Sequence, residues 1–372
     1  MRHQRILHLI GDLTPAGAEK VVVTLANGLI NLGYEVAICA REGGSLLNSL
    51  HRVPVFINRK RGLLDPRHLL RLCRLARRHR FDLIHSHLFG NDLYAFLAGS
   101  ITRTATILTV HGEDSFLNPG RRRFYRVAAK HVSKIVAVSK SLYERLVGEL
   151  GISPEKVALI PNGIDSSWFL ANDNGHDLRA ALNLPAQAPI VGAVGRITPV
   201  KGYDLLLEAA AEVISHFPDA QFLVVGARPK QEDGYCRLLD ELVTQKGLRH
   251  AVHFVGVRHD IKDLLRLFDV YVLPSRSEGI SLALLEAMAA ARPIVATNVG
   301  GTSEVLQPEC TGLLVSPDDP AQLARAVMRL LADRSLAVRL GVAARHIVER
   351  DFSAQSMITH YRTLYDGVTR SA

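Results

Sequence analysis

The chain has 372 residues, of which 48% are hydrophobic and 22% are charged, with a formal net charge of +9. This composition excludes a disordered or low-complexity protein, and a prior of about 100 to 200 residues per domain predicts two domains. The four cysteines, Cys39, Cys73, Cys236 and Cys310, form no CxxC pair. Free thiols are therefore favoured over disulfides or a zinc site.

The positive charge is concentrated in the first half of the chain. Residues 1–185 hold 25 Lys and Arg against 15 Asp and Glu, whereas the remainder holds 20 against 21. This asymmetry indicates that the first half faces something anionic, such as a membrane surface, a phosphorylated lipid or a nucleic acid.

The apolar runs of the sequence are short. The run before Gly11 is too short for the core of a signal peptide, and no later run approaches the length of a membrane span. We therefore expect a cytoplasmic protein, and the basic first half leaves open a peripheral contact with the inner face of the plasma membrane.

Short β-branched runs alternate with longer helical patterns in the first half, which is typical of βα units on a parallel sheet. Helices are expected between most of the strands. The predicted strands are Arg5–Ile10, Glu35–Ala40, Val53–Ile57, Phe81–His85, Ala105–Val110, Lys134–Val138 and Val157–Ile160.

A polar, irregular segment from Asp165 to Pro189 interrupts this pattern, and we interpret it as a linker between two domains. The alternation then restarts, so the fold class is α/β with two doubly wound, Rossmann-like domains. Ligands of such sheets bind beyond the carboxyl ends of the strands, which favours a site in a central crevice that the domains face. The predicted strands of the second half are Ile190–Val194, Gln221–Val225, His253–Val255, Val270–Leu273 and Pro293–Ala296.

The stretch GAVGRITPVKG, residues 192–202, has the composition of a phosphate site. A predicted strand ends at Gly195, the following turn carries Arg196 and Lys201, and Gly202 opens a helix whose free amides favour anions. The stretch is neither GxxxxGK[ST] nor GxGxxG, so the ordinary nucleotide-binding fingerprints are absent. Taken alone, it is equally compatible with an exposed turn that carries two surface cations.

Two carboxylates interrupt the apolar stretch SRSEGISLALLEAMA, residues 275–289. A buried strand precedes the stretch and a helix follows, with Ser281 as its predicted N-cap. Glu278 then lies in the strand-to-helix loop, and Glu286 lies roughly 7.5 Å further along the helix axis, too far to share a proton with it. Because an unpaired buried carboxylate is costly, the two indicate contacts along an extended ligand. The alternative is a solvated loop residue and an ion pair with a neighbouring helix.

Several residues of the first half follow predicted strands and are further ligand candidates. Gly17 begins a helix, where backbone can approach a ligand closely. His85, His87 and His111 lie at strand ends, where a histidine can exchange hydrogen bonds with a substrate. Satisfied strand-end residues are the simpler interpretation of His85 and His87, and both interpretations stay open for His111. The sequence has no DxD and no cluster of carboxylates and histidines, so no metal or other cofactor is expected.

The segment from Asn58 to Arg80 holds nine basic residues and one acidic residue. One interpretation is a surface helix packed on its own sheet, and the other is a contact with anionic lipid, aided by the basic stretch Arg121–Arg126. Nucleic acid is less favoured, because no aromatic residues interleave with the charges. The arginines that share one predicted helix face are Arg67, Arg71, Arg74 and Arg78.

Taken together, the motifs resemble the retaining glycosyltransferases of family 4, which have the two-domain GT-B fold. Arg196, Lys201, Glu278 and Glu286 follow one another as in that family, and TVHG, VSKS, IPNGID and NVGGTSEVL occur as further motifs. The resemblance covers nearly the whole chain. It implies an N-terminal, acceptor-side domain over 1–168, a nucleotide-sugar domain over 169–352, and a final helix, 353–372, that crosses back to the first domain.

The resemblance also implies roles for the candidate catalytic residues. Arg196 and Lys201 would hold the diphosphate of a UDP- or GDP-linked hexose and stabilise the departing charge, which is the electrostatic contribution that usually dominates such catalysis. Glu278 and His111 would hold the transferred sugar. No carboxylate is assigned as a covalent nucleophile, since the family retains the anomeric configuration and generally lacks a suitably placed one.

For the donor, the resemblance implies that Glu286 accepts hydrogen bonds from the ribose, that backbone amides of the Glu278 loop hold the sugar, and that the Gly17 loop lies near the phosphates. Two departures leave the donor's identity open. The loop usually written Gly-Gly-Ala-Glu has Ala16 at its first position, and Ser281 replaces a frequent glycine. The expected donor-binding residues are Gly17, Arg196, Lys201, Glu278, Gly279, Ile280, Ser281, Leu282 and Glu286.

The expected acceptor is a lipid-linked or membrane-associated saccharide in the synthesis of a cell-surface polysaccharide, such as an exopolysaccharide, a capsule or a lipopolysaccharide. This expectation depends on the basic first half and on the family's habits. Two alternatives are a glycosyltransferase that uses a soluble small-molecule acceptor and a non-catalytic subunit that binds nucleotide sugars.

Overall fold

A computed structural model of the chain describes residues 4–62, 64–116, 118–169 and 175–370. The chain divides into two compact units, Met1–Gly163 with Ala354–Ala372, and Ile164–Ser353. The division therefore falls shortly before the boundary at 168/169 that the sequence suggested. Part of the predicted linker lies outside the described residues, and the remainder contains a 3-10 turn, Ser166–Phe169, and the helix α6, Gly175–Ala181.

Among the described residues, the first unit has a parallel sheet of seven strands in the order β3-β2-β1-β4-β5-β6-β7. The order reverses beside β1, as in a doubly wound fold. The strands are β1 (Arg5–Ile10), β2 (Glu35–Ala40), β3 (Val55–Ile57), β4 (Leu83–His87), β5 (Ala105–Val110), β6 (Lys134–Ala137) and β7 (Val157–Leu159).

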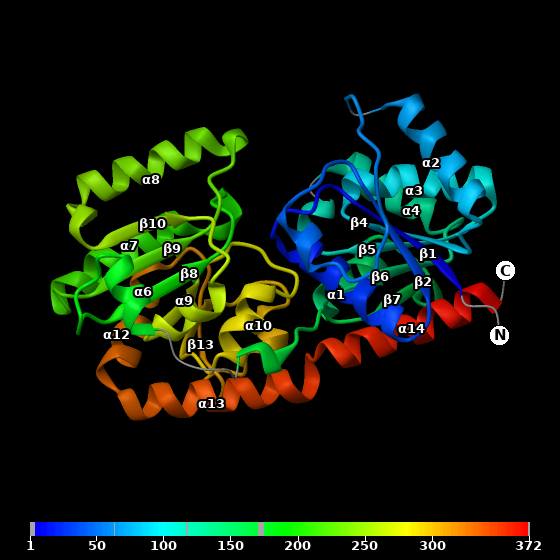
Figure 1. Ribbon diagram of the computed structural model, residues 1–372. Coiled ribbons are helices and arrows are strands. Elements are labelled where there is room, and N and C mark those ends of the chain that lie inside the picture. The colour runs from blue at the N-terminus through cyan, green and yellow to red at the C-terminus, as the bar shows by residue number, and fades with distance from the viewer. Residues whose placement is uncertain (1–3, 63, 117, 170–174, 371–372) are drawn as a thin grey trace. The chain divides into compact units, whose positions relative to one another are not determined.

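Helices cover both faces of this sheet. Figure 1 shows α2, α3 and α4 over one face, and α1 and α14 over the other. The C-terminal helix α14 packs against α1, so the prediction that the final helix returns to the first domain is confirmed. The helices are α1 (Gly17–Asn31), α2 (Pro66–His79), α3 (Phe89–Thr102), α4 (Pro119–Ala128), α5 (Lys140–Glu144) and α14 (Ala354–Arg370).

The second unit has a parallel sheet of six strands within its described residues, in the order β10-β9-β8-β11-β12-β13. A core cluster of its described residues joins one face of the sheet to α7, α8, α12 and α13. The strands are β8 (Ile190–Val194), β9 (Gln221–Val225), β10 (Val252–Gly256), β11 (Val270–Leu273), β12 (Ile294–Thr297) and β13 (Leu313–Val315). The helices are α7 (Tyr203–His216), α8 (Asp233–Gln245), α9 (Ile261–Leu267), α10 (Leu282–Ala289), α11 (Thr302–Val305), α12 (Pro320–Ala332) and α13 (Arg334–Asp351).

Local sequence explains where two important helices begin. Asp65 caps α2, because its carboxylate accepts the backbone N–H groups of Arg67 and His68 at 2.9 and 3.1 Å, and Pro66 occupies the first position of the helix. Ser281 caps α10 as predicted, since its hydroxyl oxygen accepts the N–H of Leu284 at 3.4 Å.

The predicted strands are found in the structure, most of them within a residue or two of their expected bounds. One shift matters for function: β4 runs to His87, so His85 lies inside the strand and not at its end as predicted. The strand β13 was not predicted. All four cysteines are free thiols, as expected. In the described residues, no helix combines the length and the apolar character needed to cross a membrane.

Candidate active site

Two side chains that the sequence singled out, Lys201 and Glu278, form an ion pair in the second unit. The Nζ of Lys201 lies 2.6 Å from Oε1 of Glu278, and the hydroxyl of Ser275 donates to the same oxygen at 2.6 Å. The side chain of Glu278 is only 9% exposed, whereas that of Lys201 is 25% exposed. The Glu278 carboxylate is therefore paired and hydrogen-bonded, which removes most of the cost of burying it.

Glycines allow the backbone around Glu278 to pack closely. Gly202 and Gly300 have positive φ angles of 65° and 47°, and a Cβ at either position would overlap a carbonyl oxygen, that of Pro274 or that of Glu278. Only glycine tolerates this combination of angle and proximity without strain. The glycines of the phosphate-like turn and of NVGGTSEVL thus allow their backbones to approach Pro274 and Glu278 closely.

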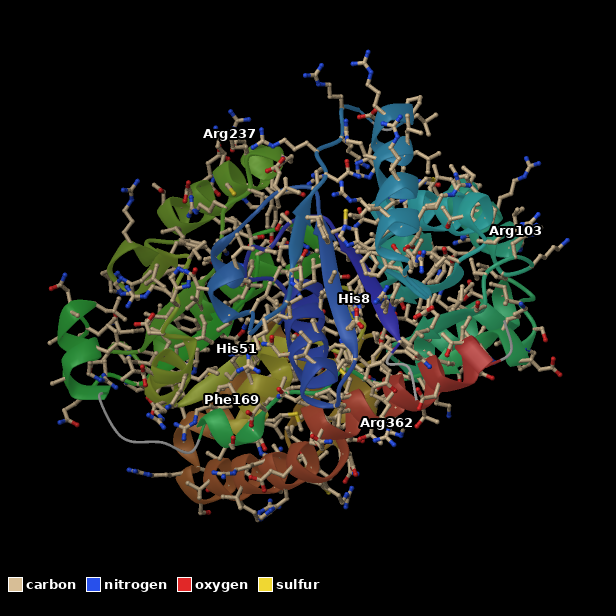
Figure 2. The ribbon with its side chains drawn as sticks, turned by 45° about the vertical axis from the view of Figure 1, so that its right-hand side comes forward. His8, His51, Arg103, Phe169, Arg237 and Arg362 are labelled. Carbon is tan, nitrogen blue, oxygen red and sulfur yellow. The ribbon has the colours of Figure 1, made fainter. Side chains whose placement is uncertain are left out.

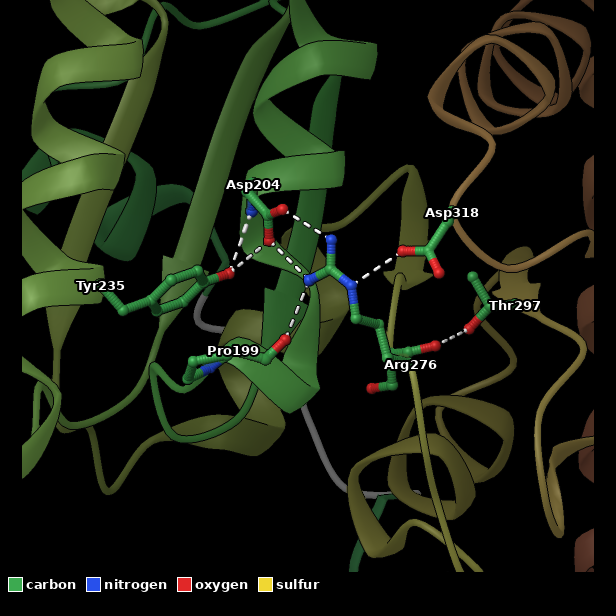
Figure 3. A network of polar contacts seen from close by, with 7 residues as sticks. Pro199, Asp204, Tyr235, Arg276, Thr297 and Asp318 are labelled. Atoms are coloured by element: carbon green, nitrogen blue, oxygen red, sulfur yellow. Dashed lines mark hydrogen bonds and ion pairs between the residues drawn. The ribbon is translucent and has the colours of Figure 1, made fainter.

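Arg276 fastens the same loop to the turn that carries Lys201 (Figure 3). Its guanidinium donates to both carboxylate oxygens of Asp204, at 2.9 and 2.7 Å, and to the carbonyl oxygen of Pro199 at 3.0 Å. Its backbone N–H donates to the carbonyl oxygen of Val200 at 2.7 Å. The loop after β11 is thereby tied to two carbonyl oxygens of the 3-10 turn Pro199–Lys201 and to the carboxylate of Asp204 in the helix that follows the turn.

The contact between Arg276 and Asp204 is an ion pair as well as a pair of hydrogen bonds. Burial alone would raise the pKa of Asp204, but hydrogen bonds from Arg276 and Tyr235 hold the pKa of this carboxyl below its usual value. The hydrogen bonds to Asp204, together with the nearby Asp318 carboxylate, raise the pKa of Arg276. Both partners are therefore charged throughout the physiological range, and their bidentate geometry is the strong form of an arginine–carboxylate pair.

The helix α10 carries the second carboxylate. Glu286 is 5% exposed, and the residues between it and Glu278 that were predicted to bind the donor, Gly279 to Leu282, are buried in the same unit. Burial, and the proximity of Tyr203, Glu278 and Glu286, raise the pKa of Tyr271 well above its usual value. Both glutamates therefore lie near Tyr271, and their carboxylate oxygens are suited to accept hydrogen bonds that a ligand's hydroxyl groups donate.

Two other predicted donor-binding residues, Arg196 and Gly17, do not take part in the ion pair of Lys201 with Glu278. Arg196 lies in the turn after β8 with an exposed side chain, and among the described residues it takes no part in the Lys201–Glu278 pair. In the first unit, Gly17 is the first residue of α1 and is exposed, and its N-cap, Ala16, provides no side-chain cap. The amides of this helix end therefore receive no hydrogen bond from a capping side chain.

The histidines of the first unit are joined by hydrogen bonds beneath α14. His8 and His87 approach at 3.1 Å between Nδ1 and Nε2, and His87 and His111 approach at 3.1 Å between Nδ1 and Nε2. His85 lies beside this chain and is bonded through Nδ1 to the hydroxyl of Tyr365 at 2.6 Å. In Figure 2 the side chain of His8 lies inside the unit, whereas that of Arg103 points to the outside.

Burial keeps these imidazoles uncharged. It lowers the pKa of His8 to about 3 and that of the partly buried His111 to about 4. Burial and the neighbouring histidines also place the pKa values of His85 and His87 well below the usual range. The favoured interpretation of His85 and His87 as satisfied residues agrees with their hydrogen bonds.

One group of described residues has the composition of a metal site. Ligand nitrogens of His8, His85 and His87 all lie within 4.8 Å of one another. Most of these nitrogens are already engaged in hydrogen bonds, with Tyr365, Thr109 or a neighbouring histidine. The sequence did not predict this cluster, because His8 is more than seventy residues away from His85 and His87 and meets them only through the pairing of β1 with β4.

Sequence reasoning also missed Ser275 and the Arg276–Asp204 pair. Ser275 and Arg276 stand in the stretch that was singled out, but nothing in their spacing shows that they hold Glu278 and the Lys201 turn. Asp204 is a first-turn residue of α7 with no local signal beyond its favourable position near a helix N-terminus.

Comparison with known proteins places the chain in a family. The model for "Glycosyltransferase Family 4" matches residues 15–168, and the model for "Glycosyl transferases group 1" matches residues 188–333. The two matches correspond to the two units, and the chain belongs to the family 4, or group 1, glycosyltransferases. It is a retaining glycosyltransferase that uses a nucleotide sugar.

Individual relatives differ in their acceptors. An Escherichia coli enzyme named UDP-Gal:alpha-D-GlcNAc-diphosphoundecaprenol alpha-1,3-galactosyltransferase is 26% identical over 94% of this chain and 93% of its own. The D-inositol 3-phosphate glycosyltransferase of Streptomyces bingchenggensis is 28% identical over 94% of this chain and 84% of its own. One protein is named for a lipid-linked acceptor and the other for a small phosphorylated one.

The fold is that of solved relatives. HepE of Anabaena, solved in complex with UDP and glucose, superposes with a TM-score of 0.89 at 22% identity, over 98% of this chain and all of that one. The prediction of a GT-B fold is therefore confirmed.

Proposed function

We propose that this enzyme transfers a hexosyl unit from a UDP-sugar to a lipid-linked saccharide, with retention of configuration. The observation that carries the proposal is the Lys201–Glu278 ion pair, held at the carboxyl end of β11 beside the capped N-terminus of α10. The UDP of the HepE complex and the UDP-Gal in the name of the Escherichia coli relative favour UDP over GDP.

The geometry of the pair suits a departing nucleoside diphosphate. The ammonium group of Lys201 has three N–H donors, and its contact with Glu278 uses one, which leaves two for phosphate oxygens. Arg196, exposed in the same turn, supplies a second cation. As the bond to the sugar breaks, negative charge develops on the diphosphate, and positioned cations stabilise that charge in the transition state.

Glu278 has two tasks in this proposal. Lys201 and Ser275 both bind its Oε1, so Oε2 can accept a hydrogen bond from a sugar hydroxyl. The same carboxylate also keeps the Lys201 ammonium aimed at the diphosphate. Glu286 accepts the ribose hydroxyl groups, and its position in a buried helix gives that contact a fixed direction. Contacts of His111 with the sugar and of the Gly17 loop with the phosphates are part of the same proposal, in which no metal ion is needed.

The Glu286 assignment is tested by calorimetry with UDP. Hydrogen bonds to a charged group contribute roughly 1.5–3 kcal/mol, so Glu286→Gln is expected to weaken UDP binding about tenfold or more. The matched control is Glu241→Gln on the exposed face of α8, which should bind UDP as the wild type does. Equal affinities of the two variants would remove the ribose role from Glu286.

The acceptor proposal depends on the surface around α2. An open groove of about 600 Å³ is lined mainly by Arg59, Arg61, Arg67 and Arg71. The exposed side chain of Leu64 lies on the same segment. Arginines beside an exposed apolar side chain are suited to a diphosphate headgroup at a membrane surface, and the relative from Escherichia coli is named for a diphosphoundecaprenol acceptor.

A second candidate acceptor is a soluble phosphorylated small molecule, because the same arginines suit any phosphate and another relative is named for D-inositol 3-phosphate. The two candidates separate in one assay, in which donor consumption is followed with a polyprenyl diphosphate-linked saccharide in detergent or with inositol phosphates. Transfer to the lipid-linked saccharide alone supports the proposal, and transfer to the soluble acceptor alone replaces it.

A further inference from the structure

Three histidines that are hydrogen-bonded in a row, here called the histidine chain, run from the interior of the first unit to the candidate site residue His111. His8 on β1 contacts His87 at the end of β4, and His87 contacts His111 after β5, each time through nitrogen atoms 3.1 Å apart. His8 and His87 are fully buried. Each of these three side chains is on the sheet face covered by α1 and α14, since the alternate residues Leu7, Ile84 and Leu108 belong to the core on the opposite face.

The number of protons in this chain is fixed. A neutral imidazole carries one N–H and one lone pair, so three neutral rings hold three protons. A hydrogen bond between two ring nitrogens uses one proton, so the two contacts use two. The third proton must lie at one end of the chain, on Nε2 of His8 or on Nδ1 of His111. The tautomers of the three rings are consequently locked to one another.

The buried end decides between these two arrangements. Nε2 of His8 is buried and has no hydrogen-bond partner among the described residues. A proton there would leave a buried N–H without an acceptor, which is among the rarest defects of folded proteins. We infer that the third proton lies on Nδ1 of His111, so that His8 and His87 are positioning residues that present His111 to its ligand as a neutral Nδ1–H donor.

The consequence for the reaction rests on the proposed role of His111 in holding the sugar. A neutral donor can bind a sugar hydroxyl without bringing a positive charge to the site, and it cannot act as a base through that nitrogen. The histidine chain also fixes the ring orientation of His111, because Nε2 of His111 is hydrogen-bonded to Nδ1 of His87. His8 and His87, which are buried, thereby restrict Nδ1 of His111 to binding a ligand oxygen that accepts a hydrogen bond.

Nitrogen-15 NMR of the histidine-labelled full-length protein at pH 7.5 tests the inference without substrate. Long-range nitrogen–proton correlations distinguish a protonated ring nitrogen from one with a lone pair, and they are expected to show His111, His87 and His8 all in the Nδ1–H form. Detection of His111 in the Nε2–H form would overturn the inference. One tightly bound zinc ion per chain would also overturn it, because a metal-bound nitrogen cannot carry the shared proton.

A pair of variants of similar shape tests the positioning role. In His87→Asn the amide can donate to Nε2 of His111 as the imidazole did, whereas His87→Leu cannot. We expect His111 to keep its Nδ1–H form in the first variant and to lose it in the second. Loss of one hydrogen bond to the substrate corresponds to a decrease of kcat/KM by about tenfold in His87→Leu.

His85→Gln is the control within the same buried cluster, since its ring lies 4.0 Å from that of His87 but outside the chain. It should leave the tautomer of His111 unchanged. If His87→Leu does not fold, the wild-type spectrum still decides. An unchanged tautomer in a folded His87→Leu would overturn the inference. If the tautomers are as expected but His111→Ala keeps full kcat/KM, the proposed contact of His111 with the sugar is wrong. The inference that the three tautomers are coupled is then still supported.

Discussion

At the scale of single residues, burial of neutral histidines links the stability of the first unit to pH. His8 has a pKa of about 3 in the folded protein, against a usual value of 6.5. Below pH 6.5 the unfolded chain therefore binds a proton that the folded protein does not, so stability is complete above this pH and decreases as the pH falls from 6.5 towards 3. His85 and His87 act in the same direction.

We predict that His8→Phe makes the protein less sensitive to acid. Each buried neutral histidine costs about 1.4 kcal/mol of unfolding free energy for each pH unit below 6.5, and the variant loses one such contribution. Urea unfolding at pH 7.5, 6.5 and 5.5, followed by a probe in the first unit, measures the slope. The control is His51→Gln, an exposed histidine of the same unit, which should keep the wild-type slope. Identical slopes for both variants would contradict the prediction.

Residues differ in how far the sequence alone revealed them. Lys201 and Glu278 could be predicted, because unusual charges stand in small, apolar surroundings at the ends of predicted strands. Ser275 and His8 could not, because a serine in a loop and a histidine in a strand have many ordinary explanations. Their importance depends on contacts between distant parts of the sequence: Ser275 donates to the oxygen of Glu278 that Lys201 reaches across 77 positions, and His8 meets His87 across 79.

At the scale of elements, the strands were predicted more accurately than their ends. In β4 the predicted strand began at Phe81, but the carboxylate of Asp82 accepts the backbone N–H of Arg5 at 2.8 Å and the strand begins after it. Its far end extends to His87, since His85 finds partners on α14 and β5 and His87 finds one on β1. The short strand β13 was missed because three apolar residues after a turn carry too little periodic signal.

The donor loop and the turn that carries Lys201 are separate elements, and Arg276 joins them. We predict that Arg276→Gln lowers the unfolding free energy by about 1–3 kcal/mol, because the partly buried carboxylate of Asp204 loses a bidentate partner. The variant should also lower kcat/KM for the donor about tenfold, since Lys201 and Glu278 lose their common support. Thermal unfolding and initial rates measure the two effects.

A second arginine provides the control for this prediction. Arg329 makes an equally short bidentate pair with Glu309, at 2.6 and 2.8 Å, but both side chains are about half exposed. Arg329→Gln is expected to change the unfolding free energy by less than about 1 kcal/mol and to leave the rates unchanged. Asp204→Asn should reproduce the effects of Arg276→Gln. Normal rates in both donor-loop variants would show that the loop holds its shape without this pair.

At the scale of the whole molecule, the charge asymmetry of the sequence becomes a surface property of the first unit. The predicted amphipathic character of α2 is confirmed: Leu72, Cys73 and Ala76 are buried, and the arginines of the opposite face are exposed. The sequence could predict this face because helical periodicity is a local property. It could not predict the acceptor, because relatives that share the fold are named for lipid-linked and for small-molecule acceptors.

If α2 contacts an anionic membrane, charge on this face must control the binding. We predict that the triple variant Arg67→Gln, Arg74→Gln, Arg78→Gln binds vesicles with phosphatidylserine about 100-fold more weakly than the wild type, since each basic residue near such a surface contributes about 1 kcal/mol. Sedimentation with vesicles at low and high salt measures the binding, and wild-type binding should decrease at high salt because screening shortens the range of the attraction.

The matched control removes three exposed arginines of the second unit, Arg237, Arg325 and Arg339, and therefore has the same net charge as the α2 variant. Only a loss confined to the α2 variant, with UDP affinity unchanged in both, assigns the membrane contact to this helix, and equal losses would show that net charge alone drives the association.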